Sequence, residues 1–221
     1  LVSARGRRQK PLRRSTEVKP VKTTFRVYTE GAATEPEYLD LLRRLPEVSS
    51  AISLDITVEE SGATPLHLVD SACQAKKKSD LDIDQYWCMF DVESPKAHPH
   101  LSAARQKARD NDVLLAISNP CFELWLALHH KYVSRHVSTE EAVKLRSSLD
   151  GSDSKHLDAD LYRPLIGVAR ANEKRLREKH LKDGTQFPDD NPSTSIGELI
   201  TMLMETAERL LDDSADSPGG T

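Results

Sequence analysis

The sequence has 221 residues, enough for one domain-sized hydrophobic core with additional helices. Its hydrophobic fraction of 38% and charged fraction of 30% are close to those of globular proteins, so most of the chain is expected to fold. No apolar run approaches the roughly 20 residues of a membrane span, and the N-terminus lacks the apolar core of a secretory signal. The sequence therefore predicts a cytoplasmic protein that does not enter a membrane.

The cysteines Cys73, Cys88 and Cys121 are odd in number and far apart in the sequence. They form no C-x-x-C pair and have no histidine at the spacing of a zinc site, so we expect reduced, mostly buried thiols. The 8 histidines show no paired-ligand spacing either, and we expect them to serve mainly in packing.

The two ends of the chain differ from its middle in composition, and the formal net charge of -4 hides a strongly basic N-terminal segment. Residues 1–22 carry one acidic side chain, Glu17, and the basic side chains of Arg5, Arg7, Arg8, Lys10, Arg13, Arg14, Lys19 and Lys22. This segment is predicted to be a disordered basic tail, which either holds nucleic-acid phosphates or only keeps the chain soluble. Residues 212–221, rich in Asp, Ser, Pro and Gly, are predicted to be a second disordered tail.

The first part of the chain alternates strand and helix patterns. Thr23–Thr29 is β-branched and aromatic and runs into Glu30-Gly31, which predicts a strand followed by a turn. Residues 34–45 have an apolar stripe behind Thr34, a predicted N-cap, and indicate a helix. Residues 53–60 alternate apolar and polar side chains, as in a strand near the edge of a sheet. Residues 64–78 predict a second helix that ends in three lysines.

The alternation continues with a continuous apolar run at residues 86–90, typical of a strand buried on both faces, which leads into Asp91-Val92-Glu93. A helix over residues 99–111, a buried strand over 113–117 and an apolar helix over 121–132 follow. Asn119 and Pro120 are expected to start the last of these helices. This order predicts an α/β fold with a mostly parallel, Rossmann-type sheet flanked by helices over residues 23–132, and with ligands at the carboxyl ends of the strands.

Residues 133–211 predict a C-terminal helical annex packed on the α/β core. Helical patterns cover residues 138–149, 158–182 and 195–211. Ser195 and Glu198 have the spacing of a capping box at the start of the last helix.

Acidic side chains follow two of the predicted strands, Glu30 after the first, and Asp91 and Glu93 after the buried central strand. Residues i and i+2 of an extended chain point to the same side, so we expect Asp91 and Glu93 to converge and Glu30 to join them from a neighbouring strand. Such carboxylates suit octahedral Mg²⁺ or Mn²⁺ acting on a phosphate ester. Acids at strand ends also cap helices or face water, and the spacing alone leaves that interpretation open.

Further residues bear on the same chemistry. Glu123, in the first turn of the apolar helix, is either an additional metal-ligating and catalytic group or a partner of the helix dipole. The helix over residues 158–182 has a basic face, suited to a nucleic-acid backbone or simply to solvent. The nucleic-acid-binding candidates on it are Arg170, Lys174, Arg175 and Arg177. The sequence contains neither G-x-x-x-x-G-K-[ST] nor G-x-G-x-x-G, so any ATPase activity would belong to a partner.

Four segments resemble, in order and spacing, the RloB-like family over roughly residues 24–205. They are TEGAATEPEY (29–38), FDVES (90–94), ISNPCFELWLALHH (117–130) and NPSTSIGEL (191–199). That family is similar to the TOPRIM domains of topoisomerases, primases and overcoming-lysogenization-defect nucleases, whose Glu and Asp-x-Asp acids bind Mg²⁺. The resemblance implies that Glu30 is the TOPRIM glutamate, Asp91 and Glu93 the acidic pair, and Glu35 the extra metal-binding acid of nuclease members. Glu93 departs from the Asp of that pattern by one methylene, which shifts its carboxylate by about one bond length.

The resemblance also implies a component of bacterial anti-phage, abortive-infection or restriction-associated loci that works beside an AAA or ABC-type ATPase. We therefore expect a Mg²⁺-dependent TOPRIM-type endonuclease, active also with Mn²⁺, that cleaves tRNA or DNA in phage defence. A homo-oligomer is compatible with this expectation. The alternative is a catalytically inactive TOPRIM-like binding module that docks on the ATPase.

Overall fold

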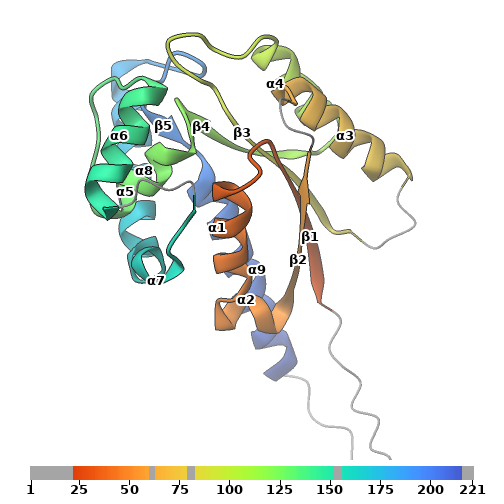
Figure 1. Ribbon diagram of the computed structural model, residues 1–221. Coiled ribbons are helices and arrows are strands. Elements are labelled where there is room, and N and C mark those ends of the chain that lie inside the picture. The colour runs from red at the N-terminus through yellow and green to blue at the C-terminus, as the bar shows by residue number, and fades with distance from the viewer. Residues whose placement is uncertain (1–21, 60–62, 79–82, 152–155, 216–221) are drawn as a thin grey trace, which may run out of the picture.

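The computed structural model describes residues 22–59, 63–78, 83–151 and 156–215. Residues 1–21 of the predicted basic tail and residues 216–221 of the second predicted tail lie outside the described residues. The fold is mixed α/β, with a five-stranded, mostly parallel sheet flanked by helices and a helical C-terminal region (Figure 1). The predicted fold class is therefore confirmed. Of the helices in the described ranges, none is long and apolar enough to cross a membrane.

The sheet has the strand order β2-β1-β3-β4-β5. Its strands are β1 (Thr23–Thr29), β2 (Ile52–Val58), β3 (Gln85–Asp91), β4 (Leu114–Asn119) and β5 (Ser193–Thr194). The first four run parallel, so their carboxyl ends share one edge of the sheet, whereas β5 pairs antiparallel with β4. Strand β2 lies at the outside of the sheet, as its alternating pattern predicted, and the apolar β3 lies in the centre.

Helices cover both faces of the sheet (Figure 1). The helices on one face are α1 (Thr34–Arg43), α2 (Pro46–Ala51), α5 (Phe122–His130) and α9 (Ile196–Ala215), and those on the other are α3 (Pro65–Lys78) and α4 (Leu101–Asp110). The C-terminal region adds α6 (Thr139–Asp150), α7 (Ala159–Tyr162), a 3-10 turn at Arg163–Leu165, and α8 (Ile166–Asp183).

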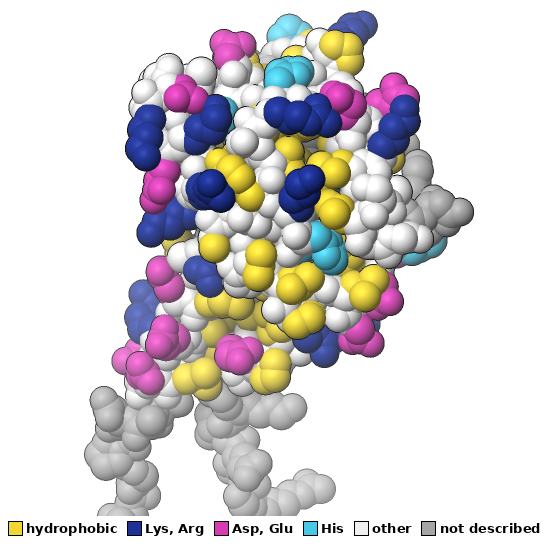
Figure 2. Space-filling model, turned by 90° about the vertical axis from the view of Figure 1, so that its left-hand side faces the viewer, with side chains coloured by type: hydrophobic (Ala, Val, Ile, Leu, Met, Phe, Trp, Pro, Cys, Tyr) yellow, Lys and Arg dark blue, Asp and Glu magenta, His cyan; other side chains and the backbone are white. Residues whose placement is uncertain are grey.

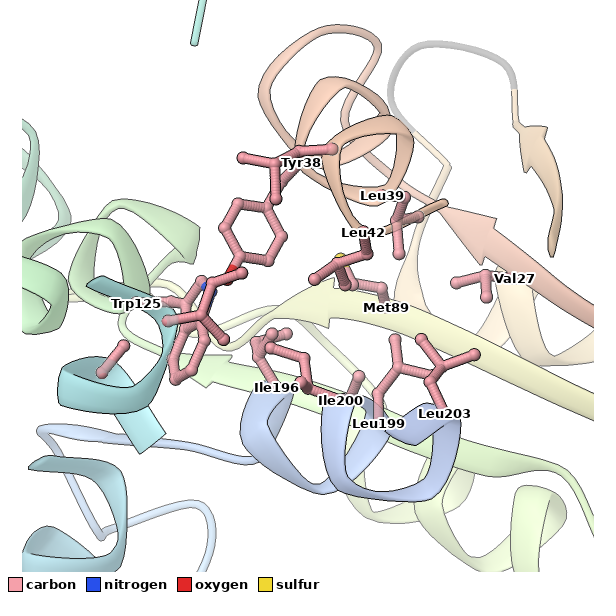
Figure 3. Close-up of a cluster of buried hydrophobic side chains, with 14 of the residues drawn as sticks. Val27, Tyr38, Leu39, Leu42, Met89, Trp125, Ile196, Leu199, Ile200 and Leu203 are labelled. Carbon is pink, nitrogen blue, oxygen red and sulfur yellow. The ribbon is translucent and has the colours of Figure 1, made fainter. Parts of the chain in front are cut away.

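Helix α9 completes the larger hydrophobic core. Its residues Leu199 and Leu203 pack in one cluster with Val27 and Met89 of the sheet and Leu42 of α1 (Figure 3). All five side chains are at most 2% exposed, and burying a side chain of this size contributes about 1.5–3 kcal/mol. The C-terminal region therefore shares its core with the α/β part of the chain.

Two predicted helix starts are wrong. Thr34 lies inside α1, whose N-cap is Ala33 and makes no side-chain capping hydrogen bond. Asn119 is the last residue of β4 and does not cap α5, which begins after Cys121. The Asn119 side-chain amide instead donates to the carbonyl of Pro188, 2.9 Å away. The side chain therefore makes a tertiary contact and is not the helix cap that the local pattern predicted.

The C-terminal helices also differ from their predicted form. The capping box at Ser195 is replaced by a hydrogen bond in which the Ser195 hydroxyl accepts from the Ile117 backbone N–H, 2.9 Å away. The helix predicted over residues 158–182 is divided into α7, the 3-10 turn and α8, because Pro164 lacks an N–H and restricts the residue before it. Helix α9 continues to Ala215, past residue 211, so residues 212–215 of the second predicted tail are helical.

Candidate carboxylate site

Two neighbouring strands deliver acids to the carboxyl edge of the sheet. The backbone N–H of Glu30 donates to the Met89 carbonyl at 3.3 Å, which continues the pairing of β1 with β3 by one residue. Asp91 is the last residue of β3 and pairs with Ser118 of β4. Parallel pairing therefore brings Glu30 and Asp91 out at the same edge, as the sequence predicted.

Glu30 has one oxygen held and one without a partner. Its Oε1 lies 3.1 Å from Nε2 of His98, and its Oε2 is buried with no hydrogen-bond partner among the described residues. Burial raises the pKa of Glu30, His98 and a hydrogen bond from the backbone of Asp91 oppose the rise, and the charge of Glu93 adds to it. A buried, unpartnered carboxylate oxygen is costly, and a ligand at Oε2 would remove that cost.

Asp91 lies at the N-terminus of α5. Burial raises its pKa well above the usual range, and the charges of Glu35 and Glu123 raise it further, as does that of Glu30. A hydrogen bond from the backbone of Phe122, the first residue of α5, opposes the rise, since a helix N-terminus favours a negative charge. Neighbouring negative charges therefore disfavour the ionised form of Asp91, whereas the N-terminus of α5 favours it.

Glu35, in the first turn of α1, folds back onto Gly31. The side chain is 8% exposed, and burial, followed by the charges of Glu123 and Glu30, raises its pKa to about 7. A Cβ atom on Gly31 would lie 2.0 Å from Glu35 Oε2, so a larger residue at position 31 would displace this carboxylate from its present position. The turn after β1 thus accommodates the extra acid that the resemblance implied.

Glu93 reaches the cluster by a different route from the one that we predicted. Strand β3 ends at Asp91, and Glu93 has a positive φ of 71°, so the alternation of an extended chain does not reach it. Its carboxylate accepts a hydrogen bond from the Thr139 hydroxyl, with 2.5 Å between Oγ1 and Oε2. Its charge nevertheless acts on Glu30, which places it beside the strand-end acids.

The predicted catalytic and metal-binding acids therefore lie together: the charges of Glu35, Glu123 and Glu30 act on Asp91, and that of Glu93 acts on Glu30. They are Glu30, Glu35, Asp91, Glu93 and Glu123. Within the described ranges, however, no three His, Cys, Asp or Glu side chains are grouped so that they could hold a metal ion as they stand. The oxygen donors and the crowded negative charge fit a hard divalent cation, but at least one carboxylate would have to rotate to ligate it. Their roles as ligands and catalysts stay predictions.

Two residues that touch these acids could not be selected from any local sequence pattern. His98 contacts Glu30 from the loop between β3 and α4, and Thr139 contacts Glu93 from the first residue of α6. The one available signal for His98 is its place in the segment that directly follows Asp91 and Glu93, at the functional edge of a parallel sheet. Thr139 had no such signal, because its contact depends on how α6 packs.

Three of the predicted nucleic-acid-binding side chains line one cavity. Arg170, Lys174 and Arg177 project into a space of about 540 Å³ between α8 and α9. Arg170 donates to the Thr201 hydroxyl at 2.9 Å, and Arg177 pairs with Glu198 at 2.6 Å. Two of the three cations are therefore already engaged in joining the two helices, whereas Lys174 is exposed.

The fourth, Arg175, points elsewhere. Its guanidinium carbon lies 3.9 Å from the centre of the Tyr132 ring, a cation–π contact that fastens α8 to the segment after α5. Figure 2 shows the side of the molecule on which α6, α7 and α8 lie, with Lys and Arg spread over its upper half, acidic side chains among them, and apolar side chains gathered below. The structure thus divides the predicted basic face between helix packing and solvent.

A family model described as RloB-like protein matches residues 25–203. A search of curated proteins gives no match, and a search of solved structures gives none either. The matched range runs from β1 into α9 and includes all five acids of the cluster. The chain therefore belongs to the RloB-like protein family.

Proposed function

We propose that this protein is a Mg²⁺-dependent nuclease of the TOPRIM type that hydrolyses phosphodiester bonds in tRNA or DNA, with Mn²⁺ able to replace Mg²⁺. One observation carries the proposal: carboxylates from separate strand ends and helix starts lie close together. Burial and the charges of neighbouring acids raise the pKa of Glu35 to about 7 and that of Asp91 well above its usual range. A divalent cation among them would relieve this repulsion.

The ligands would be Glu30, through its unpartnered Oε2, together with Asp91, Glu93 and Glu35. A divalent ion held there supplies a Lewis acid for the phosphoryl oxygens and a more acidic bound water. Glu123 assists by adding negative charge beside Asp91. His98 orients Glu30 through its hydrogen bond.

The proposed setting is the bacterial cytoplasm, where the nuclease acts as a phage-defence effector beside an AAA or ABC-type ATPase. Membership of the RloB-like family and the motifs described above support this setting. The sequence contains no Walker-type or dinucleotide-binding glycine loop, which fits a division of labour between this chain and an ATPase partner.

A binding module without turnover is the second candidate, and one observation favours it. Because the described acids form no ready-made group of three ligands, their charges could serve docking on a basic partner surface instead of metal binding. The two candidates differ in whether the protein takes up a divalent ion through Glu30 and Asp91.

The test compares wild type with Glu30→Gln and Asp91→Asn in cleavage of tRNA and supercoiled plasmid with Mg²⁺ or Mn²⁺. Each substitution keeps the side-chain shape and removes a negative charge, so the cleavage rate is expected to fall by about 10³-fold, since a metal-bound transition state loses several kcal/mol of stabilisation. Isothermal titration calorimetry with Mn²⁺ gives a readout that does not depend on turnover.

The matched control is Glu47→Gln, the same chemical change at an exposed position on α2, which should leave cleavage and Mn²⁺ uptake unchanged. Equal cleavage by wild type, Glu30→Gln and Asp91→Asn would reject the assigned site. Absence of Mn²⁺ uptake and of cleavage in the wild type would favour the binding module.

A further inference from the structure

The loop after β3 and the start of α6 are joined by three hydrogen bonds around Thr139. Its hydroxyl donates to Glu93 Oε2 at 2.5 Å and accepts from the backbone N–H of Ser94 at 3.0 Å. The Thr139 backbone N–H donates to the Ser94 carbonyl, also at 3.0 Å. One side chain thus fixes both the backbone beside Glu93 and the carboxylate itself.

Glu93 needs such support for two physical reasons. Its backbone adopts the left-handed region, with φ at 71°, which is uncommon for a residue other than glycine, and the Glu93 N–H is held by the Pro120 carbonyl at 2.8 Å. Its side chain is long, and the like charge of Glu30 acts against its approach. A neutral hydroxyl donor holds the carboxylate in place without cancelling the charge that a cation would bind.

The segment that delivers Thr139 is anchored by the NPST segment, whereas the cap before Thr139 stabilises α6 itself. Ser138, the residue before Thr139, forms this cap in a capping box with Glu141. Asn191, from the NPST segment, accepts from the Val137 N–H at 3.0 Å and donates to the Val137 carbonyl at 2.9 Å. This contact gives a role to a motif that lies outside the carboxylate cluster, because it anchors the segment that delivers Thr139.

From this geometry we infer that Thr139 is a positioning residue, which holds Glu93 in reach of a divalent ion shared with Glu30. The inference rests on the proposed nuclease function. Thr139 acts through Glu93 and touches neither the ion nor the substrate.

The experiment compares wild type, Thr139→Val, Thr139→Ser and Ser138→Ala. For each, calorimetry measures Mn²⁺ affinity, a cleavage assay measures the Mn²⁺ concentration that gives half the maximal rate, and thermal unfolding reports stability. Thr139→Val keeps the side-chain shape but loses the hydroxyl, so Mn²⁺ affinity should fall about 10- to 100-fold, with a matching rise in the half-maximal Mn²⁺ concentration. Thr139→Ser keeps the hydroxyl and should restore wild-type affinity.

Ser138→Ala is the matched control, because it removes the cap of the same helix and leaves the Thr139 hydroxyl in place. It should lower thermal stability while Mn²⁺ affinity stays at the wild-type value. Wild-type Mn²⁺ affinity in Thr139→Val, or an equal loss in Thr139→Val and Ser138→Ala, would overturn the positioning role while leaving the nuclease proposal intact. A wild-type protein that neither binds Mn²⁺ nor cleaves nucleic acid would overturn both. Thr139→Ala provides a second hydroxyl-free variant if the valine variant does not fold.

Discussion

His98 is the residue in direct contact with the acid that follows the first strand. Its Nε2 lies 3.1 Å from Glu30 Oε1, and the pair is only partly exposed to solvent. We expect His98→Ala to lower kcat/KM for nucleic-acid cleavage about tenfold, because a hydrogen bond to a charged group contributes about 1.5–3 kcal/mol and each 1.36 kcal/mol corresponds to about a factor of ten. Steady-state kinetics at saturating Mg²⁺ measures the effect.

The control for His98 is His136→Ala, which removes an exposed imidazole and should leave the rate unchanged. A His98→Ala variant as active as wild type would show that Glu30 keeps its orientation through burial alone. The site would then consist of the acids without a supporting histidine.

At the residue scale, the sequence predicted the positions of the acids better than it predicted the residues that hydrogen-bond to them. Glu30 and Asp91 could be placed because parallel strands end at one edge of a sheet, and that rule needs only the strand pattern. His98 and Thr139 are joined to their acids by tertiary contacts between segments distant in the sequence, which no local pattern reports. The direction of the Glu93 side chain was predicted wrongly, because strand β3 ends at Asp91 and the backbone of Glu93 is left-handed, so strand alternation does not apply to it.

Helix α8 carries a buried carboxyl group that makes stability depend on pH. Glu173 is 3% exposed, and burial, opposed by Arg177 and reinforced by Glu198, raises its pKa from 4.5 to about 7. Between these values the folded protein binds more protons than the unfolded chain, so the free energy of unfolding decreases as pH rises from 4.5 through 7.

We therefore expect Glu173→Gln to be more stable than wild type at pH 8, by up to about 3 kcal/mol, with the difference largely gone at pH 4.5. The glutamine keeps an acceptor for the Gly197 backbone and carries no charge to bury. Urea unfolding at the two pH values measures the difference. Glu178→Gln, on the exposed side of the same helix, should show no such pH dependence.

At the element scale, long amphipathic patterns predicted elements well and short ones did not. The capping box at Ser138 begins α6 close to the predicted start, and Gly184 ends α8 in the left-handed conformation that glycine favours. Strand β5 escaped prediction because its two residues, Ser193 and Thr194, are too few to show a period. Its existence depends on pairing with β4, which only the assembled fold provides.

The molecule as a whole is expected to unfold in one transition, because α9 and the sheet share a core. Leu199 is fully buried in the cluster that includes β1, β3 and α1. Leu199→Ala should lower the free energy of unfolding by about 2–5 kcal/mol and shift the far-UV circular dichroism and tryptophan fluorescence transitions together, since Trp87 lies in the sheet and Trp125 in α5.

Leu181→Ala is the control, since this leucine is 77% exposed and its loss should change stability by less than about 0.5 kcal/mol. Two separate transitions in Leu199→Ala would indicate that the C-terminal helices unfold independently. The boundary predicted near residue 132 would then mark a unit of stability as well as a change of architecture.

The short strand β5 also bears on self-association. Residues 114–117 of β4, Leu-Leu-Ala-Ile, are uncharged and rich in β-formers, and an open margin of this kind invites strand addition from another chain and growth into fibrils. Ser195 donates its N–H to the Ile117 carbonyl and accepts from the Ile117 N–H, while Ser193 and Thr194 pair with the residues that follow. Ser193, Thr194 and Ser195 thus occupy the edge of β4 from Ile117 to Asn119, and another chain would have to displace them to add a strand there.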